Sequence, residues 1–308
     1  FFGLYANVDN FNYTEKNIPL ADRPEIDRWI ISLLNSLIRE VAADYADYEA
    51  TAATRKIQNF VDQHLSNWYV RLCRRRFWKG DYSEDKIAAY QTLYDCMIAV
   101  AKMMAPVAPF FADWLYRNLN TITKKENHLS VHLADFPTVD DTSIDMALEQ
   151  RMSYAQSISS LVLSLRKKEK IRVRQPLQKI LLPVLDTAFQ EQIEKVKDLI
   201  LSEVNVKDIE FMTDTGGIIK KGIKPNFKTL GRRMGKHMKT VAQKISQFGD
   251  AEIAQLERDG NMNIEIDGAT FELTLEDFEI TTQDIPGWLV ATDGPLTVAL
   301  DVTLNEDL

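Results

Sequence analysis

Cysteine is scarce in this sequence, which has 308 residues but only Cys73 and Cys96. Both fall inside helical patterns, so no disulfide framework is expected, and a reducing, cytoplasmic setting is favoured. The sequence also lacks a run of about 18 uninterrupted apolar residues, which a membrane-spanning helix requires. We therefore expect a protein that does not enter a membrane.

Groupings of reactive or metal-binding residues are missing as well. The four histidines are scattered, and His128 and His132 lie in a strand-like stretch without the Glu of a zinc-protease helix. The spacing of the residues supports no Ser-His-Asp or Cys-His arrangement. We therefore predict neither a metal site nor a catalytic residue in this sequence.

The two ends lack the features of natural termini. Residues 1–5 read FFGLY, without an initiator Met, a basic segment or a cleavage site. Residues 305–308 follow directly on a strand-like run. We expect a piece cut from a larger protein at the first end, and a second cut at the other.

Basic residues are outnumbered by acids, and the formal net charge is −8, but the bases are concentrated in three windows. Residues 71–79 carry five Lys or Arg and no acid, residues 166–174 carry six and one Glu, and residues 216–239 carry eight and no acid. The windows sum to +18, so the remaining chain carries −26. A single basic run is often a solvated helix face, but attraction to phosphate depends on the local potential, and three such windows favour a nucleic-acid partner.

The first half of the sequence predicts four amphipathic helices with short connections, which is typical of a helical bundle. These helices are expected at about 24–41, 50–77, 84–104 and from 109 onward. Asp22 is expected to cap the first helix and Ser83 the third, and Pro109 follows a bend before the fourth. The expected inward residues are Ile26, Trp29, Ile30, Leu33, Leu34, Leu37 and Val41 in the first helix, and Ile57, Val61, Leu65, Trp68 and Leu72 in the second.

The second half mixes helical and strand patterns. A long helix is expected at about 144–170, further helices at 187–201 and 231–247, and strands at 130–133, 180–184, 204–211, 262–266, 270–273, 288–292 and 297–301. The predicted fold is mainly α: a helical bundle in residues 1–125, a linker and long connecting helix in 126–170, and a smaller α+β C-terminal domain in 171–308.

The second helix carries the densest pattern of candidate binding residues. On an ideal helix, Asn67, Arg71, Arg74 and Trp78 fall within about 60° of one another, beside the core line through Val61. Guanidinium groups donate bidentate hydrogen bonds to phosphate, and Arg and Trp offer planes on which an unpaired base stacks. We therefore predict that this row binds RNA.

Neighbouring residues of the same helix are less clear. Arg75 and Arg76 flank the core line, and pairing with acids of other helices is the favoured interpretation for both. Arg75 stays open as a candidate RNA contact, together with Lys79 at the helix end. Trp68 is expected in the core, and Cys73 on the side away from the row.

At this stretch the sequence resembles a known family. LSNWYVRLCRRRFW (65–78) is very similar to the signature of the anticodon-binding domain of isoleucyl-tRNA synthetases, although the family more often has Arg-Ser where this sequence has Leu72-Cys73. Other segments before and after this stretch also match, in the same order as in the family. They are FFGLYANVDNF (1–11), EIDRWIISLLNSLIREV (25–41), SVHLADFP (130–137), VRQPL (173–177), KPNFKTLGRRMGKHMK (224–239) and GPLTVALDVTLNEDL (294–308). The last two resemble the subgroup that bacteria share with archaea and eukaryotes. The absence of the four C-terminal cysteines that bind zinc in other members agrees with this placement.

The resemblance implies a role in attaching isoleucine to its tRNA. In the family, ATP and Mg are bound by a catalytic domain with HIGH and KMSKS signatures, and neither signature occurs here. The implied task of this sequence is therefore non-catalytic. It would bind the anticodon stem-loop of the tRNA for isoleucine, with anticodon GAU, as part of a cytoplasmic, monomeric enzyme.

The other two basic windows supply further candidate tRNA contacts. Arg172 and Arg174 lie after a helix end, where the helix dipole favours cations even without a ligand, so both interpretations stay open. In the third window the candidates are Lys228, Arg232, Arg233 and Lys236, because no acid is available locally to pair them.

Two alternatives remain open from the sequence alone. One is the equivalent region of a valyl-tRNA synthetase, which shares the first motif. The other is a helical scaffold that binds proteins, which predicts that apolar surface covers the row from Asn67 to Trp78.

Overall fold

The computed structural model describes residues 1–184, 186–212, 220–249, 252–253, 255–256, 260–266, 269–283, 287–294 and 296–303. Only the backbone is described at residues 220–222, 232, 236, 266, 269 and 279–283. The chain divides into two compact units, Phe1–Met152 (unit 1) and Ser153–Leu308 (unit 2). No helix in the described ranges is long and apolar enough to span a bilayer.

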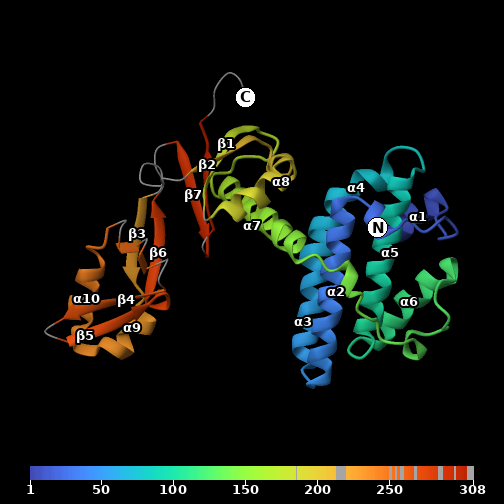
Figure 1. Cartoon of the computed structure of the whole chain (residues 1–308), viewed down its shortest axis with the longest axis horizontal. Helices are drawn as coiled ribbons and strands as arrows, with labels where there is room; N and C mark the ends of the chain where they lie inside the picture. The colour runs from blue at the N-terminus through green and yellow to red at the C-terminus, as the bar shows by residue number, and fades with distance from the viewer. Residues whose placement is uncertain are drawn as a thin grey trace. The chain divides into compact units, whose positions relative to one another are not determined.

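Unit 1 is built from helices (Figure 1). The α-helices are α1 Phe2–Asp9, α2 Glu25–Ala46, α3 Ala50–Asn59, α4 Arg71–Trp78, α5 Glu84–Met104 and α6 Pro109–Thr123, with the first part of α7 Met146–Lys168. Short 3-10 turns are η1 Leu20–Asp22, η3 Val131–Leu133 and η4 Asp141–Ser143. The segment η2 Phe60–Val70 is π-helical and joins α3 to α4 without a break, so one helix runs over residues 50–78.

The core of unit 1 lies between α2, α3–α4 and α5. Most of the predicted stripe on α2 is buried, from Trp29 to Val41, whereas Ile26 and Leu33 are half-buried. Asp22 does not cap α2, because it belongs to η1 and the helix begins after Pro24. Ser83 caps α5 as predicted, accepting a hydrogen bond from the backbone N–H of Lys86.

The stretch after α6 differs from the prediction. Residues 130–133 were expected to form a strand, but they form the 3-10 turn η3. The reason is a carboxylate on α6: Asp113 Oδ1 accepts from the Ser130 hydroxyl (2.6 Å) and from the N–H of Val131 (3.0 Å). The second bond takes up a backbone N–H that a strand would pair, and the first fixes the Ser130 side chain to α6, so the segment packs on the helices instead.

Unit 2 contains a four-stranded sheet with strand order β2-β1-β8-β7. Its strands are β1 Leu177–Pro183, β2 Val206–Met212, β7 Trp288–Asp293 and β8 Leu296–Asp301. The pair β1–β2 is parallel, as a βαβ connection through α8 Thr187–Val204 requires, and the other pairs are antiparallel. The apolar residues of α8 recur at helical spacing and are buried, from Phe189 to Val204.

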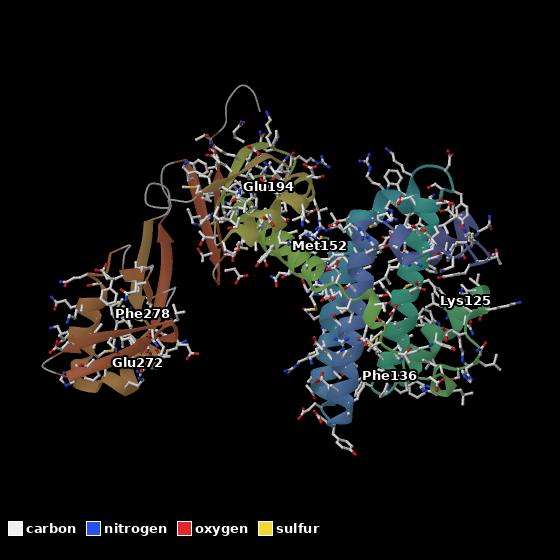
Figure 2. All side chains as sticks on the ribbon, in the orientation of Figure 1. Lys125, Phe136, Met152, Glu194, Glu272 and Phe278 are labelled. Atoms are coloured by element: carbon white, nitrogen blue, oxygen red, sulfur yellow. The ribbon has the colours of Figure 1, made fainter. Side chains whose placement is uncertain are left out.

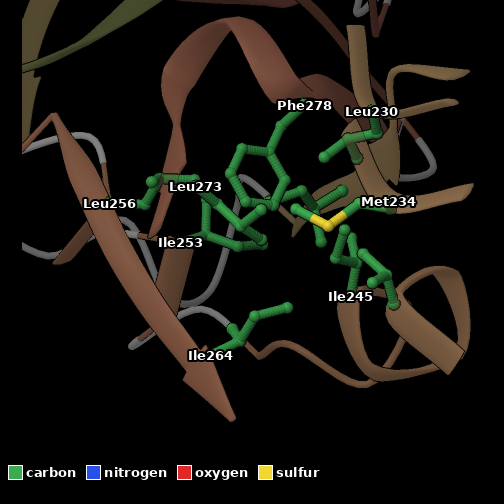
Figure 3. Packing of buried hydrophobic residues seen from close by; sticks show 10 residues of the cluster. Leu230, Met234, Ile245, Ile253, Leu256, Ile264, Leu273 and Phe278 are labelled. Carbon is green, nitrogen blue, oxygen red and sulfur yellow. The ribbon is translucent and has the colours of Figure 1, made fainter. Parts of the chain in front are cut away.

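A second group of elements in unit 2 has a core of its own. These elements are β3 Lys220–Pro225, α9 Phe227–Met234, η5 Gly235–His237, α10 Met238–Ile245, β4 Asn261–Ile266, β5 Ala269–Thr274, η6 Leu275–Asp277 and β6 Phe278–Gln283. The strands pair as β3–β6 and β4–β5, both antiparallel. Leu230, Met234, Ile245, Leu273 and Phe278 meet in this core, which Figure 3 shows from close by.

The fold class is therefore as predicted, a helical bundle followed by an α+β region. The structural division lies inside α7, between Met152 (labelled in Figure 2) and Ser153. Residues 131–143, expected in a linker, pack on α2, α5 and α6 of unit 1. The expected domain limits at residues 125 and 170 stay a prediction.

Candidate nucleic-acid interface

The end of the helix over residues 50–78 presents a row of polar and aromatic side chains to solvent. Asn67, Arg71, Arg74 and Trp78 are all exposed, and 52% of the Trp78 surface is accessible. Trp68 is buried, as predicted. The row therefore has the orientation that RNA binding requires, while its role stays a prediction.

The cations of this row differ in how they are held. The Nε of Arg71 donates to the carbonyl of Asn67 (2.7 Å), and its guanidinium lies 5.6 Å from the centre of the Trp68 ring. Within the described residues, the guanidinium groups of Arg74 and Arg75 have no hydrogen-bond or ion-pair partner. Both are therefore available to an anion. The interpretation of Arg75 as a partner of acids on other helices is wrong, because its side chain is exposed and unpaired.

Lys79 lies directly after the helix and is also exposed. Its Nζ is 5.7 Å from the centre of the Trp78 ring, a cation–π distance. An exposed ring beside cations combines stacking with charge, which suits an unpaired nucleotide.

Arg76, by contrast, belongs to the framework, as predicted. Its Nη1 and Nη2 lie 2.7 and 2.9 Å from the two carboxylate oxygens of Asp27 on α2, and Asp27 is completely buried. It also pairs with Asp85 on α5, and the hydroxyl of Tyr69 donates to Asp27 (2.8 Å). This network fixes the end of the long helix against two other helices.

The π-helical segment changes which residues face the core. Val61 and Leu72 were predicted inward but are half-buried, whereas Phe60 and Tyr69 are buried. In a π-helix the hydrogen bonds run from i to i+5, so each residue turns by less than the ideal α-helical angle. The buried residues Phe60 and Leu65 are accordingly five positions apart.

Cys73 faces the interior, on the side away from the exposed row, as predicted. Burial raises the pKa of its thiol to about 12, although Arg76 acts in the opposite direction. A thiol that stays protonated at neutral pH is a poor nucleophile and a poor metal ligand. Within the described ranges, no cluster of three or more His, Cys, Asp or Glu side chains is placed to hold a metal ion.

The second basic window lies in unit 2. Arg172 and Arg174 are exposed, and their side chains have no hydrogen-bond or ion-pair partner among the described residues. Arg166 is buried, with 1% of its surface accessible, and donates to backbone carbonyls. Sequence reasoning missed this difference, because a basic run at a helix end gives no sign of which cation turns inward.

In the third window, Lys228 is exposed on α9. The absence of a local acid does not leave Arg233 unpaired, because its Nη1 lies 2.6 Å from the buried carboxylate of Asp277, a residue distant in the sequence. Its Nη2 donates to the carbonyl of Glu272 on β5, labelled in Figure 2. The side chains of Arg232 and Lys236 lie outside the described residues.

A family model described as "Anticodon-binding domain of tRNA ligase" matches residues 27–181. The match covers half of the sequence and includes the exposed row, the Arg76–Asp27 pair and the turn with Arg172 and Arg174. The chain belongs to this family.

Similarity to curated proteins extends over the whole sequence. Proteins named isoleucine–tRNA ligase from Bacteroides thetaiotaomicron and Cytophaga hutchinsonii are 53% and 54% identical to it over 308 residues. One of the same name from Protochlamydia amoebophila is 38% identical over 310 residues. In each comparison all of this chain is covered, but only 26%, 28% and 29% of the relative. The chain thus spans little more than a quarter of the length of these relatives.

Proposed function

We propose that this chain binds the anticodon stem-loop of the tRNA for isoleucine, as the RNA-binding part of an isoleucine–tRNA ligase. The observation that supports the proposal most directly is the row of exposed groups that ends the long helix of unit 1, with Arg74 and Arg75 unpaired beside the Trp78 ring. The names of the relatives favour isoleucine over valine as the amino acid.

The chemistry of the row fits an anticodon loop. Guanidinium groups bind phosphate oxygens in a bidentate manner, and they keep their charge at any physiological pH. The exposed face of Trp78 offers a stacking surface, which is worth about 1–3 kcal/mol for each stacked base. Proteins that recognise RNA by sequence bind mostly unpaired loop bases, and an anticodon loop offers such bases.

The framework beneath the row supports the same proposal. Because Arg76 is fixed by Asp27 and Asp85, the last turn of the helix is held in place before any RNA arrives. Binding then costs less ordering of the protein. A protein-binding scaffold would instead present an apolar surface at this position, and the exposed groups here are mainly polar or charged.

The proposed task within the enzyme is to hold the tRNA so that its acceptor end reaches the catalytic centre. Isoleucine activation, with its ATP and Mg, is assigned to sequence beyond these 308 residues, because HIGH and KMSKS signatures are not among them. The same proposal makes the protein a cytoplasmic monomer.

The test is a competition assay of the chain with purified tRNAs for isoleucine, valine and an unrelated amino acid. We expect the tRNA for isoleucine to displace a labelled anticodon stem-loop at the lowest concentration. The logarithm of the binding constant should fall with the logarithm of salt concentration by about 0.7–0.9 for each phosphate contact. Equal competition by all tRNAs, or a flat salt dependence, contradicts the proposal, and a preference for the tRNA for valine supports the valyl alternative.

A further inference from the structure

Arg166, near the end of α7, is a buried cation without a counter-ion. Its Nη1 donates to the carbonyls of Gln175 (2.9 Å) and Arg172 (3.2 Å), and its Nη2 to the carbonyl of Asn205 (2.9 Å). Within the described residues no carboxylate pairs with it, and burial lowers the pKa of its guanidinium. Burying an unpaired charge is unfavourable, so the arrangement points to a requirement for what Arg166 holds in place.

What it holds is the turn that follows α7. Besides the two bonds from Arg166, the N–H of Gln175 donates to the carbonyl of Arg172 (3.0 Å). The side-chain amide of Asn205 donates to the carbonyl of Val173 (2.8 Å). Three carbonyls of the turn thus accept hydrogen bonds, which leaves its backbone little freedom.

The side chains of the same turn are exposed. Lys170, Arg172 and Arg174 are solvent-accessible, and none of their charged groups has a hydrogen-bond or ion-pair partner among the described residues. Glu169 is the single acid between residues 166 and 174. Cations gathered on an ordered backbone with a single acid nearby repel one another unless an anion lies between them.

The backbone at Lys170 supplies an independent observation. Its φ is +57°, in the left-handed region, where the N–H of Ile171 donates back to the carbonyl of Arg166 (2.8 Å) and ends the helix. Glycine is the usual residue at this position, because a Cβ is unfavourable there. The backbone at Lys170 is therefore strained, as it is at Lys124 after α6, so a change to glycine should not destabilise either position.

The class of ligand follows from what the turn lacks. Residues 166–176 contain no aromatic residue, so no ring is offered for base stacking, and the exposed apolar side chain of the turn is Val173. Cations without stacking partners bind phosphate groups and carry no direct sequence information.

We propose that the turn over residues 170–174 binds the sugar–phosphate backbone of tRNA through Lys170, Arg172 and Arg174, without reading its sequence. The inference rests on the proposed function, which supplies the tRNA. It adds an RNA contact in unit 2, built on the Arg166 anchor, to the row that ends the long helix of unit 1.

Lys170→Gly separates binding from folding in a single change. The variant removes one phosphate contact and also relieves the left-handed backbone. We expect about 3- to 10-fold weaker binding of an unmodified tRNA transcript, and a decrease of about one in the slope of log K against log salt. The melting temperature should be unchanged or higher by about 2–3 °C.

The chain offers a matched control in Lys124, which is exposed and ends α6 with a φ of +52°. Lys124→Gly removes the same charge from the same backbone conformation and should leave tRNA affinity unchanged. The double variant Arg172→Ala with Arg174→Ala should weaken binding more than Lys170→Gly. Each variant of the turn should keep the preference of the unaltered chain for a GAU stem-loop over a scrambled loop, because phosphate contacts do not read sequence.

The outcomes separate the two proposals. If the unaltered chain binds no tRNA, the proposed function fails and this inference fails with it. If the unaltered chain binds tRNA but Lys170→Gly keeps its affinity and salt slope, only the inference is overturned. A loss of binding that matches the loss in Lys124→Gly, or that accompanies a lower melting temperature, also overturns it.

Discussion

The two basic segments at residues 71–79 and 166–174 carry the same net charge but are built differently. In the first, Arg76 turns inward to the buried carboxylate of Asp27. In the second, Arg166 turns inward to backbone carbonyls alone. In each segment one arginine belongs to the framework, and the other arginines are exposed to solvent. A count of charges along the sequence therefore overstates the cations that are free to bind a ligand.

The segments also differ in what accompanies the exposed cations. The first presents the Trp78 ring and the Asn67 amide beside Arg74, on a rigid helix. The second presents cations alone, on a turn held by hydrogen bonds. Rings and amides recognise bases, whereas cations alone recognise phosphate. The difference agrees with the two proposals, base recognition by the first segment and backbone contact by the second.

The largest expected effect separates Arg76 from its neighbour Arg75. Arg76→Ala leaves the Asp27 carboxylate buried and unpaired, so it should lower the free energy of unfolding of unit 1 by about 3–5 kcal/mol. Arg75→Ala, at an exposed and unpaired position, should change it by less than about 0.5 kcal/mol. Urea unfolding measures both, and similar losses in the two variants would mean that the assigned roles are wrong.

The corresponding test in the second segment is Arg166→Met. The substitution keeps much of the side-chain volume but removes the donors to three carbonyls, and should destabilise unit 2 by about 2–3 kcal/mol. Arg172→Ala serves as the exposed control, with an expected change below about 0.5 kcal/mol. Amide hydrogen exchange in the strands β1 and β2 reports the difference, and equal protection in both variants would contradict the anchoring role of Arg166.

A smaller effect concerns the ring that distinguishes the two segments. Trp78→Ala should weaken binding of an anticodon stem-loop by about 1–3 kcal/mol, the value of one stacked base. Trp114→Ala, which removes an equally exposed ring from α6, should leave that affinity unchanged. Fluorescence anisotropy with a labelled stem-loop measures both. A loss in the control equal to that in Trp78→Ala would argue for nonspecific contact.

The smallest expected signal comes from the cysteines. Burial raises the pKa of Cys73 to about 12 and also raises that of Cys96, so both thiols stay protonated at pH 8 and lack the reactive thiolate. A thiol reagent at pH 8 should label neither in the folded chain and both after unfolding in urea. A Trp78→Cys variant should be labelled at once, because that position is exposed. Rapid labelling of native Cys73 would place the exposed row on the wrong face of the helix.

Local patterns predicted much of this fold. Ser83 caps α5 where the sequence indicates it, and the predicted helices of unit 1 begin within one residue of the expected positions, although α2 continues to Ala46 instead of ending near residue 41. Short β-like runs between glycine-containing turns predicted the strands β7 and β8. Such features depend on residues within one or two turns of each other, which a sequence displays directly.

The errors arise where distant residues decide the outcome. Asp113 turns residues 130–133 into a 3-10 turn, and Asp277 pairs with Arg233 across 44 positions of the sequence. The strand β3 forms because it pairs with β6, far along the chain. The π-helical segment shifts the buried face near Phe60, and an ideal helical angle does not show this shift.

The site was predicted in the same uneven way. Helical spacing placed Asn67, Arg71, Arg74 and Trp78 on one row, and the structure leaves all four exposed. Helical spacing could not show that Arg75 is unpaired while Arg76 is paired, because the partner of Arg76, Asp27, lies on another helix. The buried position of Arg166 also depends on carbonyls that only the folded turn brings together.

The most direct test is a titration of the chain with a GAU anticodon stem-loop and with a scrambled loop of the same length. Two single variants accompany the unaltered chain: Arg74→Ala in the row, and Arg55→Ala, an exposed arginine 19 residues earlier in the same helix. We predict that the unaltered chain and Arg55→Ala bind the GAU loop equally and prefer it to the scrambled loop, whereas Arg74→Ala binds it about 10-fold more weakly with unchanged stability. Equal binding by all three proteins, or no preference between the two loops, would contradict the account.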